Sequence, residues 1–87
     1  MQIEYSKAAG KYISTLDKPT KKRLKKKIEG LTETPPKGDI KPLQGYIKGT
    51  MRLRDGKIRV IYRYTIDSNQ QKMLYISAID SRGDIYK

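Results

Sequence analysis

The sequence contains no cysteine and no histidine. Without cysteine there are no disulfide bonds and no thiolate nucleophile, and without either residue the common zinc sites are excluded. The remaining metal ligands are nine Asp and Glu residues, which are scattered along the chain. We therefore expect a protein that uses neither a metal ion nor any other cofactor.

Aromatic residues are restricted as well, because the sequence has no Phe and no Trp and relies on seven tyrosines. Hydrophobic residues make up 36% of the chain, which allows only a small core. Buried tyrosines need partners for their hydroxyl groups, so many hydroxyls should lie at the rim of that core. The 87 residues are near the lower size limit for a self-sufficient core, and we expect residues 1–87 to form one domain.

Long apolar segments are missing too. The chain opens with MQIEYSKAAGKYIS, which contains no apolar segment of signal-peptide length, and no run of transmembrane length occurs in the sequence. We therefore expect a cytoplasmic protein without a membrane partner.

Acidic residues are few, since nine Asp and Glu stand against 20 Lys and Arg and leave a net charge of +11. Such a surplus on a small domain causes strong self-repulsion. Solubility alone is one explanation, because charged surfaces keep a protein dispersed. The explanation we favour is an anionic partner, either nucleic acid or an acidic protein.

The first third of the chain predicts one strand followed by two helices. Residues 2–5 alternate in polarity like a short strand, Ser6 is a suitable N-cap, and apolar residues then recur at helical spacing. Asp17 caps a second helix with Pro19 in its first turn, where the missing N–H costs little. The apolar stripes are Ala8, Ala9, Tyr12, Ile13 and Leu16 in the first helix, and Leu24, Ile28 and Leu31 in the second.

Six of the seven residues from 21 to 27 are Lys or Arg. They surround the apolar stripe of the second helix, and they form either a solvated helix face or part of a functional basic surface. The segment TPPKGDIKPLQG then ends the helix, because Pro35 and Pro36 cannot continue it. We interpret this segment as a connector.

The second half of the chain predicts antiparallel strands. Residues 51–54 alternate between apolar and basic, Asp55-Gly56 indicates a tight turn, and residues 57–66 alternate again. Further strands are expected at 73–79 and 85–87. The apolar parity of the strand 57–66 should face the core, and consists of Ile58, Val60, Tyr62, Tyr64 and Ile66.

This order of elements predicts an α+β fold, in which a two-helix hairpin packs on one face of a twisted antiparallel sheet of four to five strands. The opposite face stays partly open. Arg52, Arg54 and Arg59 should lie close together there. Because three neighbouring cations repel, either water screens them or an anion belongs between them. A guanidinium group fits phosphate oxygens with two parallel hydrogen bonds, so phosphate is a suitable anion.

The segments LQGYIKGTMRLRDGKIRVIY and ISAIDSRGDIYK resemble the RelE branch of the RelE/ParE toxin superfamily, from bacterial and archaeal toxin–antitoxin pairs. The resemblance extends over essentially the whole chain. It implies the RelE-like microbial ribonuclease fold and a type II toxin that cleaves mRNA in the ribosomal A site. In that family the 2′-hydroxyl attacks the neighbouring phosphate without a metal ion, which gives a 2′,3′-cyclic phosphate and a free 5′-hydroxyl.

Matched onto this chain, the resemblance implies catalytic roles for four residues. Arg59 and Arg82 would stabilise the charge that builds on the phosphate, and Tyr86 would act as the general base. Arg52 matches one residue of a basic pair, whereas Thr50 stands where the best-known members have lysine. The residues expected to bind RNA and to compensate for this difference are Arg54, Lys48 and Lys57.

The resemblance also implies partners. These are a cognate antitoxin that neutralises the toxin, the ribosome with its mRNA, and DNA only indirectly through the antitoxin. Two other functions stay open at this point. One is a ParE-like toxin that inhibits DNA gyrase without cleaving RNA, and the other is an inactive member that only binds.

Each candidate residue has a structural alternative. Tyr86 is alternatively a rim tyrosine that packs the last strand, and Arg82 is alternatively a residue that follows a strand end near Asp80. Tyr62 and Tyr64 are expected in the core because of their parity. General contacts with RNA or the ribosome are the most that we expect of Arg63 and Lys57.

Overall fold

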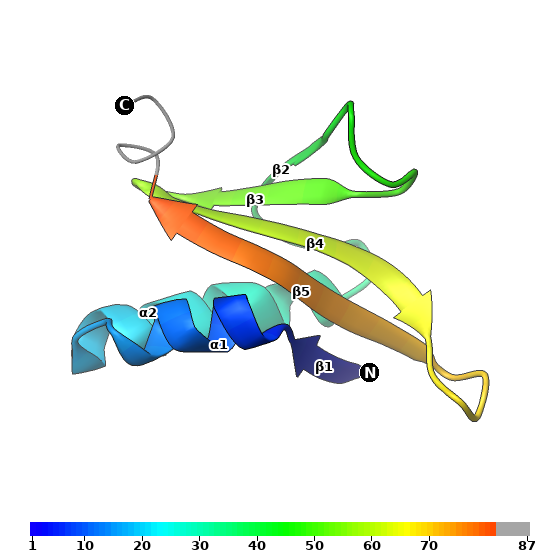
Figure 1. Cartoon of the computed structure of the whole chain (residues 1–87), viewed down its shortest axis with the longest axis horizontal. Helices are drawn as coiled ribbons and strands as arrows, with labels where there is room; N and C mark the ends of the chain where they lie inside the picture. Colours follow the sequence, from blue (N-terminus) through cyan, green and yellow to red (C-terminus); the bar gives the residue numbers. More distant parts are fainter. Residues whose placement is uncertain (82–87) are drawn as a thin grey trace.

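The computed structural model describes residues 1–81, and Figure 1 shows two helices below a twisted sheet. The elements in chain order are β1 (Gln2–Tyr5), α1 (Lys7–Ser14), α2 (Lys18–Glu29), the short 3₁₀ helix η1 (Gly30–Thr32), β2 (Asp39–Pro42), β3 (Met51–Asp55), β4 (Ile58–Ile66) and β5 (Lys72–Ser81). None of the helices in this part of the chain is long and apolar enough to cross a membrane.

The start of α1 is fixed by Ser6, as its position in the sequence predicts. The Ser6 hydroxyl accepts a hydrogen bond from the backbone N–H of Ala9 at 3.0 Å, which satisfies one of the free donors of the first turn. The same hydroxyl donates to the carbonyl of Ser77 at 2.8 Å. The N-cap therefore also ties the helix to β5.

The second helix is held by its apolar stripe. Leu24 and Ile28 of α2 and Leu31 of η1 are fully buried, whereas most of the surrounding lysines are exposed. Tyr64 of β4 donates its hydroxyl to the carbonyl of Leu31 at 2.6 Å. Because repelling lysines do little to hold a helix, this docking supplies its stability.

The five strands form one sheet in the order β1-β5-β4-β3-β2. The predicted α+β class and the packing of both helices on one face are confirmed. Four strands are antiparallel neighbours, but β1 runs parallel to β5, so the sheet is mixed rather than purely antiparallel. A parallel pair needs a long connection, which the helices and strands between β1 and β5 provide.

The edge strand β2 is not predicted by the sequence pattern, which indicates a connector over these residues. It pairs with β3 through Asp39 opposite Arg54 and Ile40 opposite Leu53. The Pro42 residue at its end argues against a central strand, but Pro is tolerated at an edge, where one side of the strand needs no partner. The expected strand at 85–87 lies outside the described residues.

The β3–β4 turn lies one residue later than expected. Asp55 pairs with Ile58, so the two loop residues are Gly56 and Lys57 rather than Asp55 and Gly56. Gly56 has a φ of 63°, which suits a glycine at the first central position of a hairpin turn. This register places Arg54 directly opposite Arg59.

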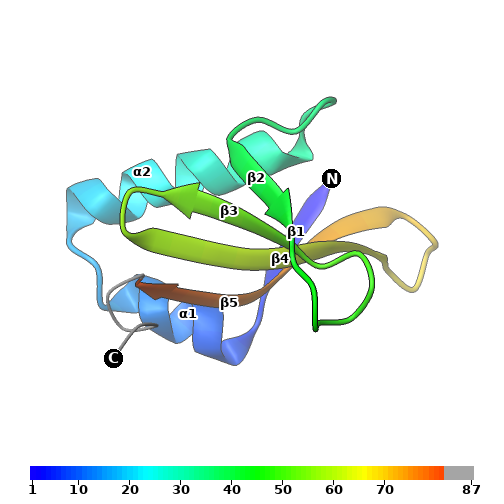
Figure 2. The same ribbon diagram turned by 90° about the horizontal axis from the view of Figure 1, so that it is seen from above.

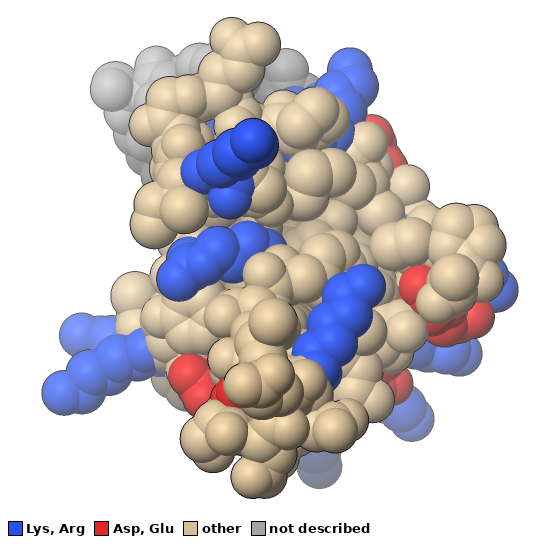
Figure 3. Space-filling model, turned by 90° about the vertical axis from the view of Figure 1, so that its right-hand side faces the viewer, with Lys and Arg blue, Asp and Glu red and all other residues tan. Residues whose placement is uncertain are grey.

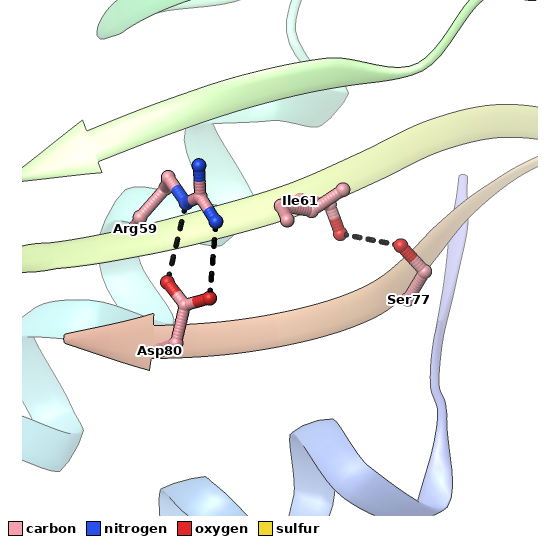
Figure 4. Close-up of polar contacts among 4 residues, drawn as sticks. All are labelled: Arg59, Ile61, Ser77 and Asp80. Carbon is pink, nitrogen blue, oxygen red and sulfur yellow. Dashed lines mark hydrogen bonds and ion pairs between the residues drawn. The ribbon is translucent and has the colours of Figure 1, made fainter. Parts of the chain in front are cut away.

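A β-bulge on β5 changes which residues face the helices. Ile61 pairs with Ala78 and Tyr62 pairs with Ile76, so Ser77 is the extra residue. The Ser77 hydroxyl donates to the carbonyl of Ile61 at 3.1 Å (Figure 4). Beyond the bulge the parity of β5 is reversed, which turns Ile79 into the core and Asp80 away from it.

The core lies between the helices and one face of the sheet. Figure 2 shows the strands in front of the helices, with the other face uncovered by any helix. The predicted core parity of β4 is confirmed for its first four members, whereas Ile66 is 65% exposed because the end of the strand extends past the helices. We call the helix-free side the open face. Among residues 1–81, the basic residues that the strands place on this face are Lys41, Arg52, Arg54, Arg59 and Arg63.

Candidate functional site

Arg54 and Arg59 form the centre of the candidate site, because the register of the hairpin sets them directly across from each other. Like charges in directly opposite positions destabilise a strand pair by roughly 0.2–1 kcal/mol. Within residues 1–81, no hydrogen bond or ion pair engages the Arg54 guanidinium. An anion bound between the two side chains would relieve this repulsion.

Arg59 is held by a carboxylate of the neighbouring strand. Its Nε and Nη2 atoms donate to the two carboxylate oxygens of Asp80, each at 3.2 Å (Figure 4). The side chains are 21% and 34% exposed, so the pair is shielded but reachable from solvent. The bulge at Ser77 makes this pair possible, since it turns Asp80 onto the open face. Any anion that binds Arg59 would therefore have to compete with Asp80.

Arg52 is buried on the same face, with only 5% of its surface exposed. Its Nη2 atom lies 3.8 Å from Oδ1 of Asp39, while its Nη1 atom has no hydrogen-bond partner among the described residues. Ile61, directly opposite on β4, is also buried. Arg52 thus adds positive charge beneath the surface next to Arg54 and Arg59, and in this arrangement it is too buried for a direct contact with a large ligand.

Thr50 does not point a free hydroxyl at the site. It is 5% exposed, and both its N–H and its hydroxyl donate to the carbonyl of Ile47, so it closes the loop between β2 and β3. Lys48 is exposed in the same loop. At about 3.3 Å per residue, this end of β3 lies roughly 13 Å from Arg54. Lys57, by contrast, is exposed in the turn beside Arg54 and Arg59.

Arg82 and Tyr86 lie outside the described residues, so their catalytic roles stay predictions. The last described residue, Ser81, pairs with Ile58 at the start of β4. Ser81 thus lies at the same end of the sheet as Arg54 and Arg59.

Arg63 of β4 makes a contact that the sequence does not predict. Its guanidinium carbon lies 4.8 Å from the centre of the Tyr75 ring, a cation–π contact between adjacent strands. The available signal was the spacing of four residues between Arg59 and Arg63, which puts both on one face of β4. The register between β4 and β5 decides which residue lies opposite Arg63, and the sequence does not reveal this register.

Three tyrosines belong to the covered face and are poor candidates for acid–base chemistry. Burial raises the pKa of Tyr62 to about 12, with a further contribution from Tyr64. Burial also raises the pKa of Tyr64 and that of Tyr5, the latter with help from the Glu29 carboxylate. Raised values keep these phenols protonated at neutral pH, in agreement with the predicted core positions of Tyr62 and Tyr64.

Positive charge is not confined to the open face, because α2 carries six Lys and Arg between residues 21 and 27. In Figure 3, Lys and Arg side chains stand apart, with uncharged residues and a few acidic ones between them. A cleft of about 380 Å³ lies beside the end of α2, lined by Arg23, Lys26, Lys27 and Lys37 together with Glu33. Two of these cations are in exposed ion pairs, Arg23 with Asp55 at 3.2 Å and Lys37 with Glu33 at 3.3 Å.

Similar folds are found among solved structures, while no curated protein matches the sequence. The toxin–antitoxin complex RelBE2 from Mycobacterium tuberculosis has a TM-score of 0.68 and 23% identity, and the match covers 93% of this chain and 96% of that one. The RelB–RelE antitoxin–toxin complex from Methanococcus jannaschii has a TM-score of 0.69 and 22% identity, covering 95% and 94%. A conserved hypothetical protein from Helicobacter pylori has a TM-score of 0.58 and 19% identity, covering 98% of both chains.

The family assignment comes from the sequence as a whole. The family model described as the ParE toxin of the type II toxin–antitoxin system parDE matches residues 3–86. This range includes both helices and all five strands except Gln2, the first residue of β1. The chain therefore belongs to the ParE toxin family, within the RelE/ParE superfamily, and is a toxin of a type II toxin–antitoxin system.

Proposed function

We propose that this toxin is a ribosome-dependent, metal-independent endoribonuclease that cleaves mRNA in the ribosomal A site and so inhibits translation. The observation that carries the proposal is the position of Arg54 directly opposite Arg59 on the open face. Two guanidinium groups in register form a site for one phosphate, because each presents a planar fork of donors. Arg52, which is buried two residues before Arg54 on β3, adds a third positive charge on the same face.

The chemistry requires that negative charge be stabilised as it develops. The 2′-oxygen forms a bond to the adjacent phosphorus, the bond from phosphorus to the 5′-oxygen breaks, and a 2′,3′-cyclic phosphate results. The 2′-proton passes to a base, for which Tyr86 is our candidate, and the leaving 5′-oxygen takes up a proton. Arg59, Arg54 and the predicted Arg82 act on the phosphate oxygens. One well-placed donor of this kind is worth about 2.7–4 kcal/mol.

The proposal includes a cognate antitoxin that neutralises the toxin. It is supported by the two similar folds, which were solved as toxin–antitoxin complexes. A net charge of +11 also suits an acidic protein segment as well as RNA. In this scheme the toxin acts in the cytoplasm on mRNA and the ribosome, and it meets DNA only through its antitoxin.

Inhibition of DNA gyrase without RNA cleavage is the second candidate function. It is favoured by one observation, namely that the matching family model is that of the ParE toxin. This function requires a binding surface but no phosphoryl-transfer chemistry.

The test uses purified toxin, purified ribosomes programmed with a defined mRNA, and primer extension to map the cleavage sites. We expect cleavage in the A-site codon, with 5′-hydroxyl and cyclic phosphate ends, in buffer whose only divalent cation is the Mg²⁺ that keeps the ribosomes intact. Arg59→Ala should lower the single-turnover cleavage rate by about 10²–10³-fold. Lys25→Ala removes one exposed cation from α2 and should leave the rate within about twofold.

A supercoiling assay with purified gyrase runs in parallel. If the mRNA stays intact on ribosomes while the toxin blocks gyrase, the endoribonuclease proposal is wrong and the second candidate is supported. Tyr86→Phe sharpens the result, because loss of a general base should slow cleavage by about 10²–10⁴-fold. A toxin that acts by binding alone should be nearly insensitive to the loss of this hydroxyl.

A further inference from the structure

The open face carries a second cationic position along the same strand. Arg63 follows Arg59 by four residues on β4, so both side chains leave the sheet on the same side. At about 3.3 Å per residue, they are separated by roughly 13 Å. Ile61 lies between them, is uncharged and is buried, so no charge intervenes along the strand.

Arg63 is oriented by the ring of Tyr75. The guanidinium carbon is 4.8 Å from the ring centre, and both residues are partly exposed. Within residues 1–81, no hydrogen bond or ion pair engages the Arg63 guanidinium. In contrast to Arg59, this side chain therefore has no carboxylate that a ligand must displace. The ring restricts its motion, so less side-chain entropy is lost when a ligand binds.

The chemistry of this pair suits a phosphate of a single-stranded nucleic acid. A guanidinium that is stacked on an aromatic ring still presents its N–H edge, which matches two phosphate oxygens. A single strand can also extend along a sheet, with its backbone tracked by basic side chains. An extended RNA strand spans the distance between Arg59 and Arg63 with two nucleotides.

We propose that Arg63, held in place by Tyr75, forms a second RNA subsite that binds the phosphate two nucleotides away from the one at Arg54 and Arg59. This inference rests on the proposed function, since it takes RNA as the ligand of the open face. It adds a direction for the bound strand, which runs along β4. It also gives Tyr75 the role of a positioning residue that acts through Arg63.

The experiment measures binding of 2′-O-methyl oligouridine, which lacks the attacking hydroxyl and cannot be cleaved. Fluorescence anisotropy with the free toxin compares a dinucleotide, which fills only the Arg54/Arg59 site, with a pentanucleotide that reaches Arg63. We expect the wild type to bind the longer strand about tenfold more tightly or better, as for a hydrogen-bonded charged contact. Arg63→Gln should abolish that gain.

The salt dependence gives a second readout. Loss of one phosphate contact should reduce the slope of log K against log salt concentration by about 0.7 for the pentanucleotide. Tyr75→Phe keeps the ring and should retain the length gain, whereas Tyr75→Leu should lose part of it. Arg63→Lys keeps the charge without the planar fork and should fall between the wild type and Arg63→Gln.

The matched control is Lys25→Gln, which removes the same charge from the exposed surface of α2. It should keep the full length gain. The inference is overturned if the wild type shows no length gain, if Arg63→Gln keeps it, or if Lys25→Gln loses it equally. A length gain that depends on Arg63 in a toxin that cleaves no mRNA would uphold this subsite while it refutes the endoribonuclease proposal.

Discussion

The two faces of the sheet are built from alternate residues of the same strands, yet they meet different demands. On β4, Val60 and Tyr62 are buried against the helices, while Arg59 and Arg63 project from the open face. The covered face is apolar except for tyrosines, one of which, Tyr64, donates its hydroxyl to the carbonyl of Leu31. The open face instead gathers guanidinium groups.

This difference shows how a small domain can carry a repulsive charge cluster. The covered face and the helices supply the stability, and the open face can then hold cations that weaken the fold slightly. Two of its arginines are already paired, Arg59 with Asp80 and Arg52 with Asp39. Arg54 and Arg63 lack such a pair within the described residues. The face is therefore partly neutralised and still able to receive an anion.

Truncation of a covered-face residue should give the largest effect on stability. Leu74 of β5 is fully buried in the core. Leu74→Ala should lower the free energy of unfolding by about 2–5 kcal/mol, because it removes buried methyl groups and leaves a cavity. The measurement is urea unfolding followed by far-ultraviolet circular dichroism.

The control for this prediction is the adjacent residue on the other face. Met73 is only partly buried on the open face, and Met73→Ala should cost less than about 1 kcal/mol. Equal losses for the two variants would contradict the separation between a structural and a functional face.

Alkaline pH should lower the free energy of unfolding through the ionisation of Tyr62, which lies on the covered face. Its pKa is about 12 in the folded protein and about 10 in the unfolded chain. Between these values the unfolded chain releases the proton while the folded chain keeps it, so the free energy of unfolding falls as pH rises. The loss approaches about 2–3 kcal/mol near pH 12.

The matched variant for this titration is Tyr62→Phe, since it removes the ionising group and keeps the ring. Urea unfolding from pH 8 to pH 12 should show a steeper decline for the wild type than for Tyr62→Phe. Lysine deprotonation affects both proteins equally and cancels in the difference. If the free energy of unfolding declines equally in both proteins, burial of Tyr62 does not control the loss of stability at alkaline pH.

A pair of Tyr-to-Phe substitutions compares the two faces with the smallest chemical change. Tyr64→Phe removes the 2.6 Å hydrogen bond to Leu31 and leaves a partly buried carbonyl without its partner. It should cost about 1 kcal/mol. Tyr75→Phe on the open face keeps the ring under Arg63 and should stay within about 0.5 kcal/mol of the wild type. Thermal or urea unfolding of both variants tests this, and a larger loss for Tyr75→Phe would reverse our assignment of the faces.

Much of the covered face could be predicted from the sequence because its periodicity is strong. Leu24, Ile28 and Leu31 recur at helical spacing, and Ile58, Val60 and Tyr62 alternate along β4. Ser6 was recognised as an N-cap by its chemistry. These signals are local, so they do not depend on how distant segments meet.

The pairings on the open face could not be predicted in the same way. They depend on register, and register was shifted by the position of the β3–β4 turn and by the bulge at Ser77. No residue type marks Ser77 as an extra residue in an otherwise continuous strand. The ion pair of Arg59 with Asp80 and the stacking of Arg63 on Tyr75 both follow from that register.

The edge strand β2 escaped prediction for a different reason. Its four residues include Lys41 and Pro42 and show too little alternation to indicate a strand. Only the neighbouring β3 gives them a hydrogen-bonding partner. The importance of Asp39 for Arg52 was therefore hidden as well.

The smallest expected change is an increase in the free energy of unfolding, and it tests whether the arginines of the open face destabilise the fold. Arg54→Thr removes one of two like charges that face each other and introduces a residue that suits a strand. Asp39 lies opposite Arg54 on β2 but makes its ion pair with Arg52, so the substitution removes no salt bridge among the described residues. The free energy of unfolding should therefore rise by about 0.2–1 kcal/mol, while binding of uncleavable RNA becomes weaker.

Lys57→Thr removes an equal charge from the exposed turn and should change stability by less than about 0.5 kcal/mol in either direction, as is usual for surface positions. If Arg54→Thr lowers the free energy of unfolding by more than Lys57→Thr does, then Arg54 stabilises the fold. In that case the position of Arg54 opposite Arg59 would not indicate a site kept for a ligand.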